Sequence, residues 1–493
     1  MTLGERIRHG TKWLFMGGVS GQALQFVFGV VLARLLVPED FGLLVTVQIF
    51  TGFVGMIASG GMGEATVQAR EVSERDYQTM FAVQLAMGLV IYAGFFLIAP
   101  WFARWFGQPI YEPLLRVSAL SFLIRPFSAN PGVRLRRAMR FKETAVIGLV
   151  SMSFAGALSI LWAWMGWGVW SLVLSGLAGA VLSALLLSWR APWRPIPRYD
   201  GESARRLGAY GAKNVLNELL VYFRAQTPNF LITKTLGPAA VGLYNKADSL
   251  SDMPLRLLGG STYQTVFRAM SQVQDDMALS QYLFLRTATL LSFYLAPIQV
   301  AIALTSQDFI VALYGVNWLE SALPLSILML GGIFAGFGYA AGAAVAAHAH
   351  LGKESVYQLQ VWAMLAFGTY FAVPYGINAV AIVTAISSLF MAFLLTQLAL
   401  RILRLSWRST WAALRGLTVP LLAECVVLLL VKEGIDEAGV VNSLLRLALV
   451  GGAGLACYAA TVLLAPPRGL EQEINRWRAL IGLKTLSLKE TRE

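Results

Sequence analysis

Long apolar runs separated by short polar segments fill most of the chain. Most runs are close to about 20 residues, the length of an α-helix that crosses the hydrocarbon core of a bilayer. Backbone polar groups find no water in lipid, so a spanning segment of this kind must be helical. The pattern therefore predicts an all-α polytopic membrane protein of about 14 transmembrane helices, in the ranges 13–36, 41–65, 79–100, 114–129, 144–164, 168–188, 209–233, 241–267, 282–304, 322–347, 356–374, 377–399, 411–431 and 442–464.

The composition agrees with this pattern. Hydrophobic residues make up 57% and charged residues 13% of the 493 positions, and the mean hydropathy is +0.63. In a soluble protein roughly 25% of the residues are charged. The composition therefore excludes an ordinary soluble protein.

A short pattern at the end of the first run returns 200 residues later, at the end of the seventh. The stretches Leu32–Leu43 and Ile232–Leu243 carry a cation, a leucine, a proline, a glycine and a leucine in register. Six spans separate the copies, so the two halves enter the membrane in the same orientation and are related by an axis along the membrane normal. Such paired halves usually enclose a solute pathway, so the repeat predicts a transporter.

The repeat also predicts the domain organisation. We expect an N-lobe of six spans, a cytoplasmic linker rich in Trp, Pro and Arg, a C-lobe of six spans, an appended pair of spans and a cytoplasmic tail. The boundaries are 1–188, 189–208, 209–405, 406–464 and 465–493. In the tail, Leu470, Ile474, Trp477 and Ile481 recur at helical spacing, which predicts an amphipathic helix lying on the inner membrane surface.

The basic residues indicate the orientation. If the amino terminus is cytoplasmic, 26 of the 39 Lys and Arg residues fall in cytoplasmic segments, 3 fall outside and 10 fall within spans. This excess predicts both termini in the cytoplasm. The net charge of +12 is scattered between apolar segments. It is therefore explained by topology and by attraction to anionic lipids, and no nucleic-acid partner is expected.

Four ordered runs carry a resemblance to a known family. They are Leu32–Gly42, Gly166–Val173, Leu236–Pro238 with Gly242–Ala247, and Phe267–Ser271. Over residues 11 to about 405 the chain resembles the polysaccharide-transport branch of the multidrug/oligosaccharidyl-lipid/polysaccharide exporter superfamily, the Wzx-type flippases.

The resemblance implies a function. It implies a bacterial inner-membrane protein that moves an undecaprenyl-pyrophosphate-linked oligosaccharide from the cytoplasmic to the periplasmic leaflet by alternating access. Its partners would be membrane lipids and a polysaccharide polymerase with its export machinery. Relatives commonly carry an acidic residue at the position of Pro228 and a proline at the position of Arg268. This chain therefore lacks the acidic group on which an ion-coupling role at position 228 would depend.

A polar face on the seventh run marks the expected cavity. Asn214, Asn217, Glu218 and Arg224 share one helical face, and Pro228 follows one turn later. A cation near mid-depth costs at least about 2.5 kcal/mol unless it is paired or hydrated. Because guanidinium binds phosphate oxygens in a two-pronged geometry, Arg224 suits a pyrophosphate or acidic sugars. The alternative is a structural ion pair with Glu218 or with a carboxylate on a neighbouring helix.

Other polar groups within the spans are weaker candidates. Arg125 precedes Pro126, and Arg256 follows Pro254 by two residues; both are further candidates for binding an anion. Lys246 is expected to pair with Asp248 or Asp252. Gln22 and Gln25 give the first span a polar face that either bonds sugar hydroxyls or joins helices.

Three other charged residues have expected structural roles. Glu424 in the thirteenth span is expected to meet Arg415 or Arg446. Arg34 and Lys234 stand at outer helix ends, where they are expected to extend to the membrane interface.

The sequence indicates no cofactor or metal site. Cys425 and Cys457 fall in late spans without a disulfide framework or a metal-ligand spacing. His9, His348 and His350 are few and lie on the cytoplasmic side. Coupling to H⁺ or Na⁺ is left open.

Two other functions compete with the flippase. A multidrug or organic-cation antiporter of the same superfamily would need buried carboxylates in the first lobe, but the first span has none. A membrane glycosyltransferase or polymerase would need catalytic groups in its outer loops, and these are short and contain no histidine, so an enzyme is not expected. No phosphate-binding motif for ATP occurs.

Overall fold

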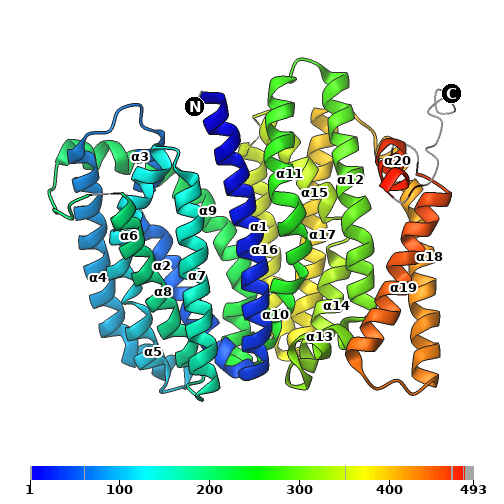
Figure 1. Cartoon of the computed structure of the whole chain (residues 1–493), viewed down its shortest axis with the longest axis horizontal. Helices are drawn as coiled ribbons and strands as arrows, with labels where there is room; N and C mark the ends of the chain where they lie inside the picture. Colours follow the sequence, from blue (N-terminus) through cyan, green and yellow to red (C-terminus); the bar gives the residue numbers. More distant parts are fainter. Residues whose placement is uncertain are drawn as a thin grey trace. The chain divides into compact units, whose positions relative to one another are not determined.

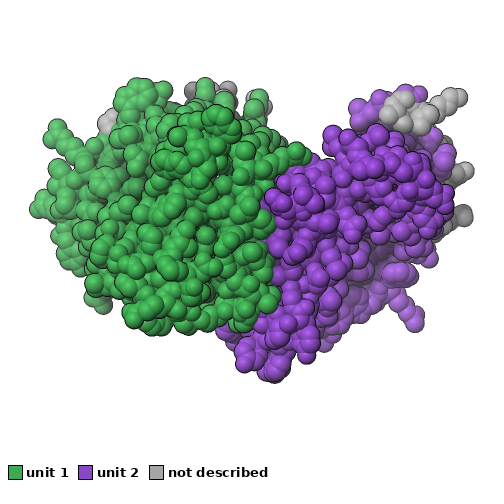
Figure 2. All heavy atoms as spheres, turned by 90° about the horizontal axis from the view of Figure 1, so that it is seen from below, with its two compact units in different colours: residues 1–242 green, residues 243–493 purple. Residues whose placement is uncertain are grey.

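Every regular element that the computed structural model describes is a helix, which confirms the predicted all-α class. The described residues are 3–59, 61–191, 193–349, 351–467, 470–480 and 482, and for 3–9, 11, 14, 59, 209–218, 259–261 and 351 only the backbone is described. Contacts divide the chain into two units, Met1–Gly242 and Leu243–Glu493 (Figure 2).

The first unit contains nine helices within the described residues and the start of a tenth (Figure 1). They are α1 (Leu3–Leu35), α2 (Pro38–Ser59), α3 (Met62–Gln68), α4 (Glu74–Phe106), α5 (Tyr111–Ser118), α6 (Ser121–Arg137), α7 (Phe141–Trp164), α8 (Val169–Arg190), α9 (Gly201–Leu236) and α10 (Pro238–Ser251), the last of which continues into the second unit.

Late in the second unit, α18 and α19 pack against each other (Figure 1). After α10 its described elements are α11 (Met253–Gln272), α12 (Met277–Leu304), α13 (Ser306–Tyr314), the short 3₁₀ helix η1 (Val316–Ser321), α14 (Ala322–Gly331), α15 (Ala335–Ala347), α16 (Leu351–Ala372), η2 (Val373–Tyr375), α17 (Ile377–Ile402), α18 (Trp407–Glu437), α19 (Ser443–Leu464) and α20 (Glu471–Leu480).

Nine helices of the described chain are long and apolar enough to cross a membrane. They lie on α1, α2, α4, α7, α8, α12, α17, α18 and α19. The segments Val316–Gly331 and Ala335–Ala347 together provide a tenth span, bent by 49°. The exact number of fourteen stays a prediction, since the other four predicted ranges fall on α5 with α6, on α9, on α10 with α11, and on α16.

Several predicted spans are interrupted by local backbone chemistry. The range 41–65 divides into α2 and α3, and Gly61 between them has φ +61°, a conformation that glycine adopts without a steric penalty. The range 241–267 divides after Ser251, because Pro254 cannot donate to a preceding turn and instead occupies the first turn of α11. Apolar patterning alone did not predict these breaks.

Small residues let the helices of the first unit approach closely. A Cβ on Gly156 of α7 would stand 2.5 Å from the ring of Phe28 on α1, and one on Gly88 of α4 would stand 2.5 Å from the carbonyl oxygen of Phe122 on α6. Small residues at helix contacts are typical of membrane proteins, where packing replaces the hydrophobic driving force.

The tail helix α20 packs on protein, which corrects the prediction that its apolar stripe lies on the membrane surface. Leu470 and Ile474 are fully buried in a cluster with Phe293, Leu417 and Tyr458. The Trp477 ring lies 5.1 Å from that of Phe293. The stripe is covered by α12, α18 and α19 because their apolar side chains supply the partner that lipid was expected to provide. Ile481 lies outside the described residues.

The predicted lobe boundaries stay a prediction. The contacts group the whole of α9 with the first unit, and α9 packs against α2, α3 and α4.

Candidate functional site

Two glycines on α2 receive side chains from neighbouring helices of the first unit. The Tyr222 hydroxyl of α9 lies 3.1 Å from the Gln48 and 2.7 Å from the Ile49 carbonyl oxygen, and donates to them. A Cβ on Gly52 would stand 2.4 Å from that hydroxyl oxygen. Glycine at this position therefore lets Tyr222 hold α9 against α2, a contact for which the sequence pattern gives no signal.

Arg224 lies two residues beyond this anchor and is half-buried. Pro228, one turn further on, has no N–H to donate to the Arg224 carbonyl oxygen. The neighbouring Phe223 ring lies 5.3 Å from the Phe53 ring of α2. The helix is thus held against α2 directly before Arg224, while its backbone lacks one intrahelical bond at that residue.

Arg125 of α6 reaches the same helix α2. Its Nη1 donates to the Gly55 carbonyl oxygen at 3.0 Å, and a Cβ on Gly55 would stand 3.2 Å from that nitrogen. The residue lines a cavity of about 20 Å³ next to Gln84, which is room for about one water molecule. The Arg125 side chain therefore contacts α2. The Tyr222 side chain, two residues before Arg224, contacts the same helix.

The two repeat copies touch each other within the first unit, and they do so reciprocally. A Cβ on Gly42 would stand 1.7 Å from the carbonyl oxygen of Pro238, and a Cβ on Gly242 would stand 2.0 Å from that of Pro38. Each proline backbone thus packs on the glycine of the other copy, which is the contact that a two-fold relation requires. Only glycine permits this approach.

A polar network adjoins the crossing of the repeats. The hydroxyl oxygens of Thr46 on α2 and Thr233 on α9 lie 2.6 Å apart, and the Tyr111 hydroxyl donates to Thr46 at 3.1 Å. All three residues are buried. These bonds link α2, α5 and α9 at the end of the unit that is predicted to be outer.

Lys234 provides another link at this end. Its Nζ donates to the Trp105 carbonyl oxygen at 2.5 Å and lies 4.9 Å from the Trp105 ring centre. A cation suits the last carbonyls of a helix such as α4. This bond holds the exposed Lys234 at the end of α4, and its expected extension to the membrane interface stays a prediction.

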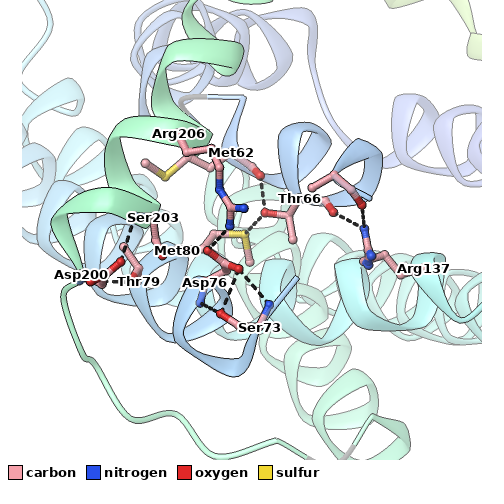
Figure 3. Close-up of polar contacts among 11 residues, drawn as sticks. Met62, Thr66, Ser73, Asp76, Thr79, Met80, Arg137, Asp200, Ser203 and Arg206 are labelled. Carbon is pink, nitrogen blue, oxygen red and sulfur yellow. Dashed lines mark hydrogen bonds and ion pairs between the residues drawn. The ribbon is translucent and has the colours of Figure 1, made fainter. Parts of the chain in front are cut away.

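A polar cluster joins α4 to the start of α9 (Figure 3). Asp76 is 2% exposed, and its carboxylate accepts from Arg206 at 2.6 Å and from the Ser73 backbone N–H at 2.8 Å. Ser73 and Asp76 form the capping box of α4. The hydrogen bond to Asp76 raises the pKa of Arg206. Asp76 and Arg206 are 130 positions apart in the sequence, so no local pattern predicts that they form an ion pair.

Arg137 closes the short helix α3 in the same region (Figure 3). Its Nη1 lies 2.6 Å from the Thr66 and 2.6 Å from the Ala69 carbonyl oxygen, near the end of α3. An open pocket of about 500 Å³ beside it is lined by Arg70, Glu71 and Arg206 among others. Arg137 is one of the basic residues that indicated the cytoplasmic side, and it also binds the carbonyl groups at the end of α3.

The predicted linker is bound to the first unit at its end. The Asp200 backbone N–H donates to the Thr79 hydroxyl at 3.1 Å, and the Asp200 carboxylate accepts from the Ser203 N–H at 2.9 Å. This is an N-cap of α9. The bond from the Ser203 N–H lowers the pKa of Asp200 below its ordinary value.

In the second unit, the predicted anion candidate Arg256 lies close to a carboxylate. Its Nη2 lies 4.0 Å from Asp252 and donates to the Ser249 carbonyl oxygen at 3.0 Å. Lys246 lies over the rings of Tyr314 and Trp318, at 4.8 and 5.4 Å from their centres. The structure does not test substrate contact by Arg256 or the pairing of Lys246 with Asp248 or Asp252, and both stay predictions.

Glu424 does not meet its expected partner Arg446. Arg446 of α19 instead bonds to Asp308 at 2.9 Å and to Asp436 at 2.5 Å. Glu424 itself is fully buried, and neither carboxylate oxygen has a hydrogen-bond partner among the described residues. The expected ion pair with Arg446 is wrong because two carboxylates nearer the end of α19 occupy its guanidinium.

The remaining candidates are only partly described. Gln22 is half-buried and Gln25 exposed on α1. The side chains of Asn214, Asn217 and Glu218 lie outside the described residues. A substrate role for these residues, and for Arg224 and Arg125, stays a prediction.

One protein family matches the part of the chain that contains both repeat copies. Residues 31–323 match the family described as polysaccharide biosynthesis protein. The chain belongs to this family. One curated relative of this chain is the succinoglycan biosynthesis transport protein ExoT of Rhizobium meliloti (strain 1021). It is 25% identical over 95% of this chain and 94% of its own length.

Solved structures with the same fold extend the comparison. The lipid II flippase MurJ, in an inward closed conformation, is 15% identical and covers 95% of this chain and 99% of its own, with a TM-score of 0.73. An inward-facing multidrug transporter of the MATE family is 16% identical and covers 79% of this chain and 99% of its own, with a TM-score of 0.61. These likenesses show the fold, and the family match confirms the predicted resemblance to proteins of polysaccharide synthesis and transport.

Proposed function

We propose that this protein is a flippase. It moves an oligosaccharide linked to undecaprenyl pyrophosphate from the cytoplasmic to the periplasmic leaflet of a bacterial inner membrane, by alternating access. The observation that carries the proposal is the family match together with likeness to a curated polysaccharide transport protein over 95% of the chain. Both termini lie in the cytoplasm, and a polymerase with its export machinery receives the product.

The side chains of the first unit suit this substrate. A pyrophosphate loses water when its sugar enters a protein cavity, and guanidinium groups replace that hydration. Arg125 on α6 and Arg224 on α9 lie on helices that contact α2. Arg125 donates to the Gly55 carbonyl oxygen through its Nη1. The polar residues of α9 and α1 would bond the sugar hydroxyls.

The reciprocal contact between Gly42 and Pro238 and between Gly242 and Pro38 fits alternating access. Two identical contacts related by a two-fold axis form together or break together. The end of the transport pathway at which they lie is therefore either closed or open. In the conformation described, the crossing of the repeats is closed. Opening to the periplasm requires these glycines to separate from the opposite prolines.

The cation antiporter of the same superfamily is the second candidate, favoured by the MATE-like fold. That fold covers 79% of the chain, whereas the lipid II flippase covers 95%. Residues 406–493 make up about 18% of the sequence, so the flippase fold must include most of this appended segment. The appended helices and the basic residues within the spans therefore favour an anionic lipid-linked substrate.

Deletion of the gene tests the function. We expect a lipid-linked oligosaccharide to accumulate on the cytoplasmic leaflet, and the intact gene to clear it. An unchanged lipid-linked pool in the deletion strain would exclude the flippase. Resistance to cationic drugs that falls in the same strain would support the antiporter instead.

A further inference from the structure

The carboxyl group of Glu424 lies near the middle of the 31-residue helix α18, on the buried side of that helix. Its exposed fraction is 0%, and both side-chain oxygens are buried without a hydrogen-bond partner in the described chain. An ionised carboxylate in such a place is strongly disfavoured unless a cation compensates it. An acid that is neither paired nor solvated is stable there only with a proton on it.

The helices around Glu424 pack tightly. On α18, Leu417 and Leu428 share the buried side with Glu424. A Cβ on Gly454 of α19 would stand 2.5 Å from the Leu428 side chain, so the two helices are in close contact one turn from the acid. The adjacent cluster contains Phe293, Leu417, Tyr458 and Val462. Water is therefore excluded from this carboxyl by aliphatic and aromatic side chains of α12, α18 and α19.

The charged and titratable groups of the adjoining helices do not neutralise it. From α19, Tyr458 faces Glu424, but its hydroxyl donates to the Phe293 carbonyl oxygen. From α12, Tyr294 donates to Glu473 of α20. On α18 itself, Cys425 adjoins the acid, and Arg415 is exposed two and a half turns away. Arg446 bonds to Asp308 and Asp436.

Two prolines give the packed helices places to bend. Pro420 lies one turn before Glu424 on α18 and removes the backbone bond to the Gly416 carbonyl oxygen. Pro297 does the same on α12, which packs against α18. Helices kink at such positions. A bend at Pro420 would separate Glu424 from α12 and expose the carboxyl group.

We propose that Glu424 is a proton-binding site of the appended helices. It holds its proton while α18 packs against α12 and α19, as in the structure described, and releases it to water when α18 bends at Pro420. Only a proton transfer is involved: the carboxyl O–H breaks, water accepts the proton, and a carboxylate remains. The return of the carboxylate to its buried position requires protonation again, so bending and proton transfer are linked.

Infrared spectroscopy on the purified full-length protein tests the proton site itself. We expect a band of a protonated carboxyl group at neutral pH that is lost in Glu424→Gln, a variant of nearly the same shape. Glu112→Gln, on an exposed carboxylate that pairs with Arg116, serves as the matched control and should leave the band unchanged. An identical band in wild type and in Glu424→Gln would mean that Glu424 is ionised, and would overturn the proposal.

Amide hydrogen exchange of residues 416–430 tests the bend. In wild type we expect protection of this segment to fall as the solution becomes alkaline, after allowance for the intrinsic pH dependence of exchange. In Glu424→Gln, which cannot ionise, protection should stay constant. Equal pH dependence in the two proteins would show that proton release and bending are not linked, which contradicts the proposal.

A link between this site and transport rests on the proposed function, and a separate experiment addresses it. In the deletion strain, the wild-type gene should restore polysaccharide export, and collapse of the proton gradient should slow it. Glu424→Gln should lose that dependence. If wild type fails to restore export, the flippase is excluded and the infrared result stands alone; if Glu424→Gln behaves as wild type, the site does not couple protons to transport.

Discussion

The hydroxyl of Tyr458 on α19 donates a hydrogen bond of 2.9 Å to the backbone carbonyl oxygen of Phe293 on α12. Pro297 stands four residues after Phe293 and has no N–H for that carbonyl. In a membrane, side chains of neighbouring helices satisfy backbone groups that proline leaves without a donor. A side chain of the appended pair thus completes the backbone of a helix in the preceding segment.

Replacing Tyr458 with phenylalanine should lower the free energy of unfolding by about 1 kcal/mol, the usual net contribution of one hydrogen bond. Pro297→Ala returns an N–H to the Phe293 carbonyl oxygen, so the same Tyr458→Phe change should cost less in that background. Thermal unfolding of the four purified proteins measures this double-mutant cycle. Equal costs in both backgrounds would contradict the assigned role of Tyr458.

Gly42→Ala should prevent the two repeat copies from closing. The new Cβ would stand 1.7 Å from the Pro238 carbonyl oxygen, so one of the two segments must move. We expect a cysteine at the buried position 46 to react faster with a polar thiol reagent in this background than in wild type. Gly94→Ala is the matched control, because nothing lies within 4 Å of its Cβ. Equal reactivity in the two alanine variants would exclude the proposed closure.

Arg125→Ala and Arg224→Ala should each reduce polysaccharide export by at least about tenfold. A hydrogen bond to a charged group contributes about 1.5–3 kcal/mol, and about 1.4 kcal/mol corresponds to a factor of ten. Arg224→Lys should keep part of the activity, since lysine retains the charge without the fork. Export is measured against protein abundance in the membrane.

The control for these variants is Arg116→Ala, which removes an ion pair with Glu112 at 2.8 Å and the contacts of the guanidinium with the ring and the carbonyl oxygen of Phe96. It should export normally. Arg256→Ala is expected to have a smaller effect than the other two, because Asp252 and the Ser249 carbonyl already contact this guanidinium. A loss of export that merely follows a loss of protein would make Arg125 and Arg224 structural residues.

Acid should loosen the first turn of α9. The pKa of Asp200 is lowered in the folded protein, so its cap stabilises the turn above the ordinary value of 3.8 and is lost as pH falls through the lower folded value. Hydrogen exchange of residues 201–206 should therefore accelerate in acid beyond the intrinsic trend. Asp200→Asn keeps a side-chain cap without a titrating group, and its exchange should lack this additional acceleration.

Thiol labelling of intact cells tests the orientation, in a chain whose two native cysteines are replaced by serine. Cysteines at the exposed positions Glu39 and Glu437 should react with an impermeant reagent from the periplasm. Cysteines at the exposed positions Ala138 and Ile196 should be shielded. Labelling at position 196 from outside would contradict the arrangement of the two lobes.

The sequence by itself determined the class of the protein, because the evidence for it is local. Apolar runs of spanning length predict helices wherever lipid denies water to the backbone. The repeat of Pro38 and Gly42 at Pro238 and Gly242 could likewise be read without coordinates, and the family match agrees with the resemblance.

Only the tertiary structure decided which charges meet. Asp76 and Arg206 are 130 residues apart in the chain, but Oδ1 of Asp76 lies 2.6 Å from Nη2 of Arg206. Arg446 bonds to Asp308 and Asp436. Glu424 therefore stays buried without a hydrogen bond among the described residues. Helical periodicity assigns a residue to a face of its own helix, but the partner on the next helix depends on packing. Small residues such as Gly52 and Gly454 decide that packing, since they set how closely each pair of helices can approach.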